Sequence, residues 1–181
     1  AKKKTEDKDA GKAVKKAVTQ ETILIVVMHA NNEIGTTQPI VQIGRIAKEY
    51  KIPFLVDAVQ AVGHIPVNVN ELGADLLSLS AHKFYGPKGI GALYARKGIK
   101  ISSFLLGGDQ EKSRRASTQN VVGAVGLAKA VELCQTRMNE EIIIQKKFRD
   151  QLFEEILKRI PGVRVNGHLT QRLPHNAHFS F

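Results

Sequence analysis

The run Thr22–Met28 (TILIVVM) decides the fold class, because its apolar and β-branched side chains follow one another without interruption. Such a run is typical of a strand that is buried on both faces of a sheet. Pro39 then stands where a helix can begin, and apolar residues recur at helical spacing as far as Tyr50. A strand followed by a helix in this way predicts a β-α-β crossover.

The rest of the chain repeats this alternation. Short apolar segments that end in polar or glycine-rich loops predict further strands, and two later stretches with helical spacing predict helices. The fold class that we predict is therefore α/β, with a mainly parallel sheet flanked by helices. The expected strands span Pro53–Val56, Asp75–Ser80 and Ile90–Tyr94, the expected helices span Val121–Met138 and Glu141–Ile160, and short strands follow at Val163–Val165 and Ala177–Phe181.

Length and composition limit the classes of protein to consider. The 181 residues are 43% hydrophobic and 24% charged, which suits one globular domain with a sizeable core. The longest apolar run, Ile23–Met28, is far shorter than the roughly 20 residues of a membrane-spanning helix. No charged region precedes an apolar block with a small-residue cleavage site, so we do not expect secretion. The single cysteine, Cys134, excludes an intramolecular disulfide and a multi-cysteine metal site, so we expect a reducing, cytoplasmic setting.

The net charge of +10 is concentrated in part at the start of the chain. Residues 1–20 carry seven lysines, and a leader of this kind is most often a solvated, frayed terminus. Binding to single-stranded nucleic acid would favour aromatic side chains interleaved with basic ones. Because the chain has no tryptophan and only 6% aromatic residues, we do not expect a nucleic-acid partner.

Polar residues gather where the predicted strands end, and ligands of mainly parallel sheets bind at that edge. Lys83 follows the strand Asp75–Ser80, where desolvation or nearby positive charge could free its amine to act as a nucleophile. Asp57 ends the preceding strand, and a carboxylate there could keep a pyridinium nitrogen protonated. Alternatively, Lys83 is a solvated loop lysine and Asp57 caps a turn. The presence of both residues at successive strand ends favours the functional interpretation.

Four motifs occur in an order and spacing that resemble those of the cysteine desulfurases, which are pyridoxal-phosphate enzymes of the class V aminotransferase group. The motifs are Asn31–Gly35 (NNEIG), Asp57–Gln60 (DAVQ), Ser80–Gly89 (SAHKFYGPKG) and Arg115–Asn120 (RASTQN), and the closing stretch Arg172–Asn176 (RLPHN) is similar too. The resemblance runs from about Thr22 to Phe181. It implies the large domain of a fold-type I pyridoxal-phosphate enzyme and the start of a small C-terminal α+β domain.

The resemblance implies a role for each residue of a candidate site. Lys83 would bind pyridoxal 5'-phosphate covalently through its amine and later act as the base in proton transfer. Asp57 would pair with the pyridine nitrogen, and Gln60 would reach the phenolic oxygen of the ring. Asn31 would lie near the same oxygen and help to orient the substrate.

The same resemblance implies that Ser80 and His82 hold the phosphate of the cofactor. Thr118 would contribute to the phosphate site of a neighbouring subunit, because the enzymes it resembles are homodimers. No metal site is implied, and the remaining histidines lack the spacing of metal ligands, so we expect them to be structural or exposed. They are His29, His64, His168, His175 and His178.

The chain departs from the family pattern at two places in its motifs and also in its length. Relatives usually carry glycine where Ser117 stands, and GGGQER where this chain has GGDQEK from Gly107 to Lys112. If residue 117 has a positive φ, the serine would be strained by roughly 1–2 kcal/mol. Family chains are also longer, and the loop with their nucleophilic cysteine has no counterpart in this sequence. The sequence is therefore expected to be the central, truncated portion of such an enzyme.

Cys134 does not replace the missing nucleophile in this interpretation. It falls at helical spacing with Leu127 and Val131, which predicts the apolar face of a helix. A lone cysteine at such a place is most often a small core residue, and apolar surroundings would raise its pKa and suppress the thiolate.

The function that the resemblance implies is that of a cysteine desulfurase. L-cysteine would be converted to L-alanine, and its sulfur would leave as a persulfide for iron–sulfur cluster assembly or thio-modification. The implied partners are a second copy of the chain and a sulfur-acceptor or scaffold protein. The alternatives are a selenocysteine lyase, another class V enzyme, or a non-catalytic remnant that binds pyridoxal phosphate.

We divide the chain into a basic leader or helix remnant (1–21), a cofactor-binding portion (22–120) and connecting helices with the start of a small domain (121–181).

Overall fold

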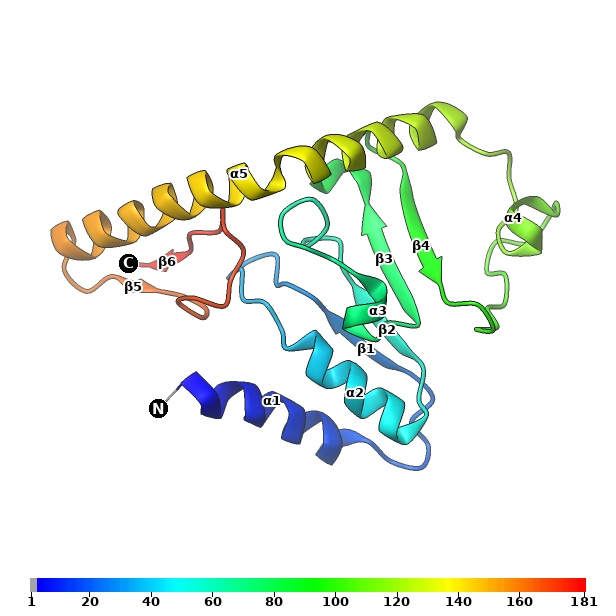
Figure 1. Cartoon of the computed structure of the whole chain (residues 1–181), viewed down its shortest axis with the longest axis horizontal. Coiled ribbons are helices and arrows are strands. Elements are labelled where there is room, and N and C mark those ends of the chain that lie inside the picture. The colour runs from blue at the N-terminus through cyan, green and yellow to red at the C-terminus, as the bar shows by residue number, and fades with distance from the viewer. Residues whose placement is uncertain (1–2) are drawn as a thin grey trace.

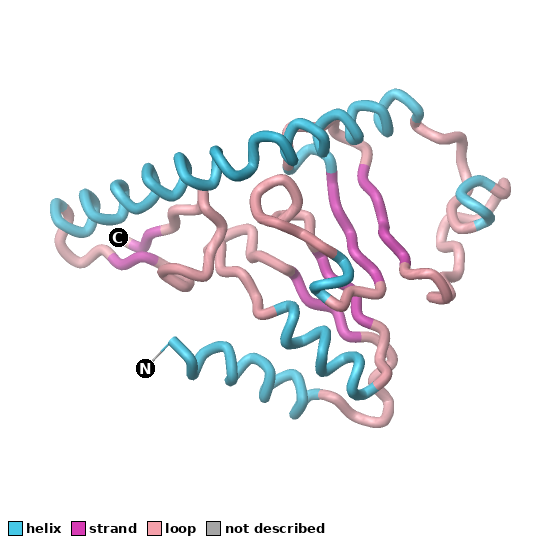
Figure 2. The backbone as a smooth tube through the Cα atoms, viewed as in Figure 1, coloured by secondary structure: helices cyan, strands magenta, loops and turns pink. Residues whose placement is uncertain are grey.

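A four-stranded sheet lies at the centre of the computed structural model, which describes residues 3–181 (Figures 1 and 2). The strands are hydrogen-bonded in the order in which they occur in the chain. The first three run parallel, and the fourth is antiparallel to the third. The prediction of an α/β fold with a mainly parallel sheet is therefore confirmed. The strands are β1 (Ile25–Met28), β2 (Phe54–Asp57), β3 (Leu76–Ser80) and β4 (Gly91–Ala95).

Helix α2 (Ile40–Tyr50) covers one face of this sheet, and the main core lies between them. The helix begins after Pro39, as predicted, and ends at Lys51, whose φ of 56° is left-handed. Its apolar side chains pack against Phe54 and Val56, both of which have no exposed surface. Gly44 lets the helix approach the short helix α3 (Val69–Leu72), which the sequence did not predict.

The other face of β1 is open, which corrects the prediction that this strand is buried on both faces. Ile25 is buried in the core, whereas Val26, on the opposite face, is 57% exposed. Successive side chains of a strand point to opposite faces. The apolar run therefore predicted the strand correctly, but only one of its faces packs against α2.

Most of the lysine-rich leader is helical, as a helix remnant would be, and only residues 3–4 of its first four could be compared with the expected frayed terminus. Residues 3–17 form helix α1 (Lys3–Ala17), which lies beside α2 (Figure 1). Val14 and Val18 pack against the core, and Lys15 Nζ pairs with Glu49 Oε2 of α2 at 2.8 Å. The apolar contacts of Val14 and Val18 thus hold this highly charged segment against the core. The prediction for residues 1–2 lies outside the described residues.

A single long helix, α5 (Val121–Arg159), replaces the two helices that were predicted over residues 121–160. The junction between them, Asn139–Glu140, contains neither proline nor glycine, so nothing interrupts the backbone hydrogen bonds there. Asn120 caps the start of α5 by accepting a hydrogen bond from the Gly123 amide at 2.9 Å. In the described part of the chain, none of the helices is apolar over enough residues to cross a bilayer.

The C-terminal residues form the predicted pair of short strands. They are β5 (Arg164–Val165) and β6 (Phe179–Ser180), which pair antiparallel beneath the far end of α5 (Figure 1). Two further elements were not predicted. One is the 3₁₀ turn η1 (Ala81–Lys83), and the other is the irregular α4 (Gln110–Ser113), in which Glu111 and Lys112 have positive φ.

Candidate active site

The strand register brings the polar strand ends together on one face of the sheet. Asp57 at the end of β2 is the register partner of Ser78 in β3, and Ser80 lies two residues further along β3. Because residues two apart in a strand share a face, these three side chains point the same way. That face is opposite the one on which Val56 and Leu77 pack toward α2. The loops that follow the strands carry the remaining candidates.

Asp57 keeps one carboxylate oxygen unused. Its Oδ1 accepts hydrogen bonds from the Val59 amide at 3.0 Å and from Ser78 Oγ at 3.4 Å. Its Oδ2 has no hydrogen bond to any described residue. The carboxylate is therefore fixed in orientation by its neighbours and can still accept from an N–H of a bound molecule.

Ser80, His82 and Lys83 follow one another where β3 passes into η1. Ser80 Oγ lies 2.8 Å from His82 Nδ1, so the two side chains orient each other. The Lys83 side chain is exposed, and within residues 3–181 its amine forms no hydrogen bond or ion pair. Gln60, in the turn after β2, is half-buried, and its amide is likewise without a described partner. The turns after β2 and β3 thus carry an amine and an amide without a described partner, beside a paired hydroxyl and imidazole.

Asn31 belongs to a loop that is held by the C-terminal segment. Its Oδ1 accepts from the amides of Glu33 and Ile34, which closes a local turn, and its Nδ2 lies 3.5 Å from the Met28 sulfur. Arg172 donates to the Ile34 carbonyl at 2.9 Å. The position of Asn31 therefore depends on residues that lie about 140 positions later in the chain.

Thr118 is the one predicted residue that the fold does not bring to the others. It lies in the segment between α4 and α5, which Figure 1 shows on the far side of β4 from β2. Its side chain is exposed and contacts no other candidate through a described hydrogen bond. Beside it, Ser117 has a φ of 89°, so the positive φ considered for this position is present.

Two histidines that the sequence did not mark as functional lie against the lysine loop. His64 Nε2 lies 2.8 Å from the Lys83 carbonyl oxygen, and the His64 and His175 ring centroids are 4.4 Å apart. Burial and the neighbouring His64 lower the pKa of His175 to about 4. No spacing rule could have found these contacts, because they join three separate segments. Among the described residues, no group of three metal-ligating side chains occurs.

Cys134 packs with Leu127 and Val131 against Phe84 of this loop, so the predicted apolar face of the helix is confirmed. It is half-buried, and its thiol donates to the Phe84 carbonyl at 3.7 Å. Burial, and to a lesser extent the charge of Glu141, raises the pKa of the thiol. The prediction of a thiol with suppressed thiolate character is confirmed.

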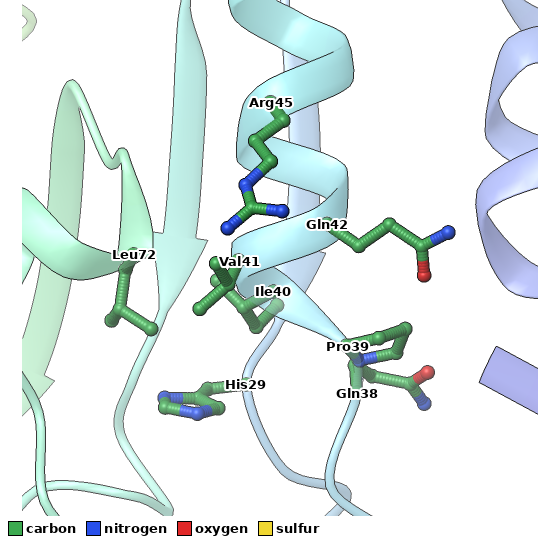
Figure 3. A pocket seen from close by; sticks show the side chains of 8 residues that line it. All are labelled: His29, Gln38, Pro39, Ile40, Val41, Gln42, Arg45 and Leu72. Carbon is green, nitrogen blue, oxygen red and sulfur yellow. The ribbon is translucent and has the colours of Figure 1, made fainter. Parts of the chain in front are cut away.

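A separate hollow of about 320 Å³ lies at the start of α2 (Figure 3). Its wall includes His29, Arg45 and Leu72, together with residues 38–42. His29 is buried, and burial lowers its pKa. Its Nδ1 has no hydrogen-bond partner in the part of the chain that the structure describes. Figure 3 shows the Gln42 side chain turned away from the His29 ring. None of the predicted site residues lines this hollow.

The side chains at the strand ends fit pyridoxal phosphate by their chemistry. The unused Asp57 Oδ2 suits a protonated ring nitrogen, and the unpaired Lys83 amine suits an aldehyde. The Ser80 hydroxyl and the His82 imidazole are donors that suit a phosphate, and the Gln60 amide suits a phenolic oxygen. Each group of the cofactor therefore has a side chain of matching type at the strand ends or in the turns that follow them.

Comparisons with known proteins agree with this match. The family model of the class-V aminotransferases matches residues 2–181. A cysteine desulfurase IscS of Dictyoglomus turgidum is 58% identical over 168 residues, which cover 93% of this chain and 43% of that protein. A solved structure of a NifS-like protein superposes with a TM-score of 0.89 at 39% identity, covering 94% of this chain and 47% of that one.

A structure of SspA in complex with cysteine is also similar. It has a TM-score of 0.66 and 44% identity, and the match covers 67% of this chain and 36% of that one. The chain thus spans less than half the length of the relatives that it matches.

Proposed function

The chain belongs to the class-V aminotransferase family, and from this premise we propose that it carries the pyridoxal-phosphate site of a cysteine desulfurase. The observation that carries the proposal is the shared face of the sheet, on which Asp57 and Ser80 stand beside the loop of Lys83. The identity to a cysteine desulfurase, 58% over 168 residues, supports the choice of activity within the family.

Bound pyridoxal phosphate would supply an electron sink for the negative charge that develops at a substrate carbon. Asp57 would hold the proton on the ring nitrogen through Oδ2, while its Oδ1 stays bonded to Val59 and Ser78. Ser80 and His82 would bind the phosphate as one unit, because their side chains already contact each other.

Lys83 would have two tasks in the proposed reaction. Its Nζ would bind the aldehyde carbon of the cofactor, and after the substrate has taken that place it would receive the proton from the α-carbon of L-cysteine. Gln60 and Asn31 would orient the ring and the substrate from the loops after β2 and β1. Lys83, Gln60 and Asn31 all lie in loops that follow strands of the sheet, so the hydrogen-bonding groups for these roles come from the same edge of the sheet.

The sulfur of L-cysteine would pass to a cysteine thiolate as a persulfide, and alanine would be released. We do not assign Cys134 to this step, because its thiol is half-buried, hydrogen-bonded to Phe84 and raised in pKa. The persulfide sulfur would go to an acceptor or scaffold protein for iron–sulfur cluster assembly or thio-modification, in the cytoplasm.

A homodimer forms part of the proposal, with Thr118 serving the phosphate site of the other subunit. Large apolar side chains are exposed in the segments on both sides of Thr118 in the sequence, since Val122 is 85% and Phe104 is 92% exposed. Exposed apolar patches often mark protein contacts, and these side chains support the proposed interface. The proposed division into leader (1–21), cofactor-binding portion (22–120) and C-terminal portion (121–181) follows the same family pattern.

The test begins with the purified chain and pyridoxal phosphate. We expect a visible absorption band from the cofactor bound to Lys83, and borohydride treatment should leave a pyridoxyl group on the peptide that contains Lys83. Lys83→Ala should abolish both signals. Lys88→Ala is the matched control, because Lys88 is an exposed lysine of the same loop.

The result that would overturn the cofactor site is a band that survives in Lys83→Ala, or a label confined to other lysines. For the activity, the loaded protein is mixed with L-cysteine and with selenocysteine in the presence of an added thiol, and alanine is measured. Alanine from cysteine supports a desulfurase. If alanine forms from selenocysteine alone, the proposed desulfurase activity is wrong and the protein is a selenocysteine lyase. If Lys83 is labelled but no alanine forms, the result favours a non-catalytic remnant that binds pyridoxal phosphate.

A further inference from the structure

The backbone just after Lys83 is held in an unusual conformation. Tyr85 has a φ of 66°, which a bulky side chain rarely adopts. The amides of Phe84 and Gly86 both donate to the Ala81 carbonyl, at 3.0 and 2.9 Å, and Phe84 is completely buried. A strained turn persists only where its surroundings hold it in place. Other segments must therefore contribute to fixing the loop that carries Lys83.

His64 holds the backbone of this turn at the carbonyl of Lys83. Its Nε2 lies 2.8 Å from the carbonyl oxygen of Lys83 itself, and a carbonyl oxygen can only accept. Nε2 must therefore carry the hydrogen. The Nδ1 atom of His64 is buried and has no hydrogen-bond partner among the described residues. A hydrogen on Nε2 and none on Nδ1 satisfies both facts, because it places no N–H at the buried nitrogen.

Two rings keep the His64 imidazole in this position. The His175 ring, from the C-terminal segment, lies 4.4 Å away between centroids at 51°. The Tyr85 ring lies 6.4 Å away in an edge-on arrangement. The imidazole thus contacts a residue of the lysine loop and a segment from the end of the chain. Its direction toward the Lys83 carbonyl is set by this packing.

From these contacts we infer that His64 is a positioning residue for Lys83, acting through the hydrogen bond from Nε2 to the Lys83 carbonyl. The inference rests on the proposed function, in which Lys83 binds the cofactor. Among the described residues the Lys83 amine has no hydrogen bond or ion pair, so the backbone is the part of this residue that the fold holds in place. A small displacement of a reacting group can slow a reaction greatly.

The test compares two amide variants that differ by one methylene. The side-chain nitrogen of glutamine can reach the place of Nε2, whereas that of asparagine can reach only the place of Nδ1. The full chain is mixed with pyridoxal phosphate, samples are reduced with borohydride over time, and the pyridoxyl label is mapped. The label on Lys88 serves as the internal reference for unspecific reaction, and melting curves check that each variant is folded.

We expect His64→Asn to slow labelling of Lys83 about five- to tenfold, the effect of one lost hydrogen bond. His64→Gln should restore the rate to within about twofold. His178→Asn is the control, because His178 bonds to Asn166 in the C-terminal strands and should leave the rate unchanged. Equal rates for the unaltered chain and a folded His64→Asn would overturn the inference, as would an equally slow His64→Gln.

A measurement without substitution keeps the inference testable if a variant does not fold. Nitrogen NMR of the unaltered chain should show the His64 hydrogen on Nε2 at neutral pH, and a hydrogen on Nδ1 alone would overturn the inference. Absence of any label on Lys83 in the unaltered chain would instead overturn the proposed cofactor site. The two failures are therefore distinguishable.

Discussion

Ser117 occupies a backbone position that favours glycine. Its φ of 89° brings the Cβ of a non-glycine residue close to the neighbouring backbone. We predict that Ser117→Gly raises the free energy of unfolding by about 0.5–1 kcal/mol, because relief of this strain exceeds the greater freedom of glycine in the unfolded chain. Urea unfolding followed by circular dichroism measures the change.

Ser102→Gly is the matched control for this prediction. Ser102 is exposed, has no positive φ and makes no described side-chain hydrogen bond. Glycine there only increases the freedom of the unfolded chain, so stability should fall by about 0.5 kcal/mol. If both substitutions lower stability equally, Ser117 is not strained.

Asp57 and Ser80 could be placed at one edge of the sheet from the sequence, because each stands at the end of an apolar run and parallel strands end at the same edge. The roles of the other site residues were predicted from the family resemblance and stay predictions. His64 was not predictable, although it touches the Lys83 backbone. Its contact is with a carbonyl 19 residues later, and it depends on the shape of the turn at Tyr85 rather than on any spacing.

The lowered pKa of His175 predicts loss of stability in acid. Burial and His64 hold this pKa at about 4, whereas an unfolded histidine titrates near 6.5. Between these two values the unfolded chain binds the proton and the folded chain does not. Stability from this residue is therefore complete above about pH 6.5, falls as the pH falls toward 4, and levels off below. Because part of the His175 residue is exposed, solvent screening reduces the effect.

His175→Phe separates this contribution from those of other groups. Phenylalanine keeps a ring against His64 but does not titrate. Unfolding free energies measured from pH 7 to pH 4 should decline less steeply in the variant than in the unaltered chain. Parallel curves would show that His175 takes up its proton equally well in the folded and unfolded states.

At the scale of elements, the contact of α2 with α3 depends on a glycine. A Cβ at Gly44 would collide with the Leu72 carbonyl oxygen, which is backbone and cannot swing away. We predict that Gly44→Ala lowers the free energy of unfolding by about 1–2 kcal/mol, although alanine is the better helix former by about 1 kcal/mol. Chemical denaturation at neutral pH measures this.

Gly11 in α1 provides the contrasting case for the same substitution. A Cβ at Gly11 would meet the end of the Gln42 side chain, which can rotate aside. Gly11→Ala should therefore leave stability unchanged or raise it by up to about 1 kcal/mol. If Gly11→Ala lowers the free energy of unfolding as much as Gly44→Ala does, the Gln42 side chain cannot rotate aside between α1 and α2.

Strand positions were more predictable than helix limits or exposure. Apolar runs located β2 to β4 to within one residue and β1 to within three, because buried strands need such runs. The length of α5 was missed because no residue at 139–140 either stops or requires a helix. The open face of β1 was missed for a different reason. A run such as Ile25–Met28 shows that burial on both faces is possible, but packing decides whether it occurs.

At the scale of the whole molecule, one arginine joins the end of the chain to the candidate site. Arg172 is only 4% exposed and donates to the carbonyls of Asn166, His168 and Ile34 and to Asn176 Oδ1. Its guanidinium also lies 4.9 Å from the centre of the Phe153 ring of α5. The C-terminal strands, α5 and the loop of Asn31 therefore meet at this single side chain.

Arg172→Lys should separate these parts, because one ammonium group cannot donate in the directions of a planar guanidinium. Buried carbonyls would lose their donors, and we predict a loss of about 2–4 kcal/mol in unfolding free energy. Hydrogen exchange should accelerate at the amides of Thr37 and Leu173, which bond to Gln171 and Gly35 across the same junction. Arg164→Lys, at an exposed arginine of β5, is the control and should change stability by less than about 0.5 kcal/mol. Unchanged exchange at Thr37 in a destabilised Arg172→Lys would show that the loop of Asn31 holds its conformation without the C-terminal segment.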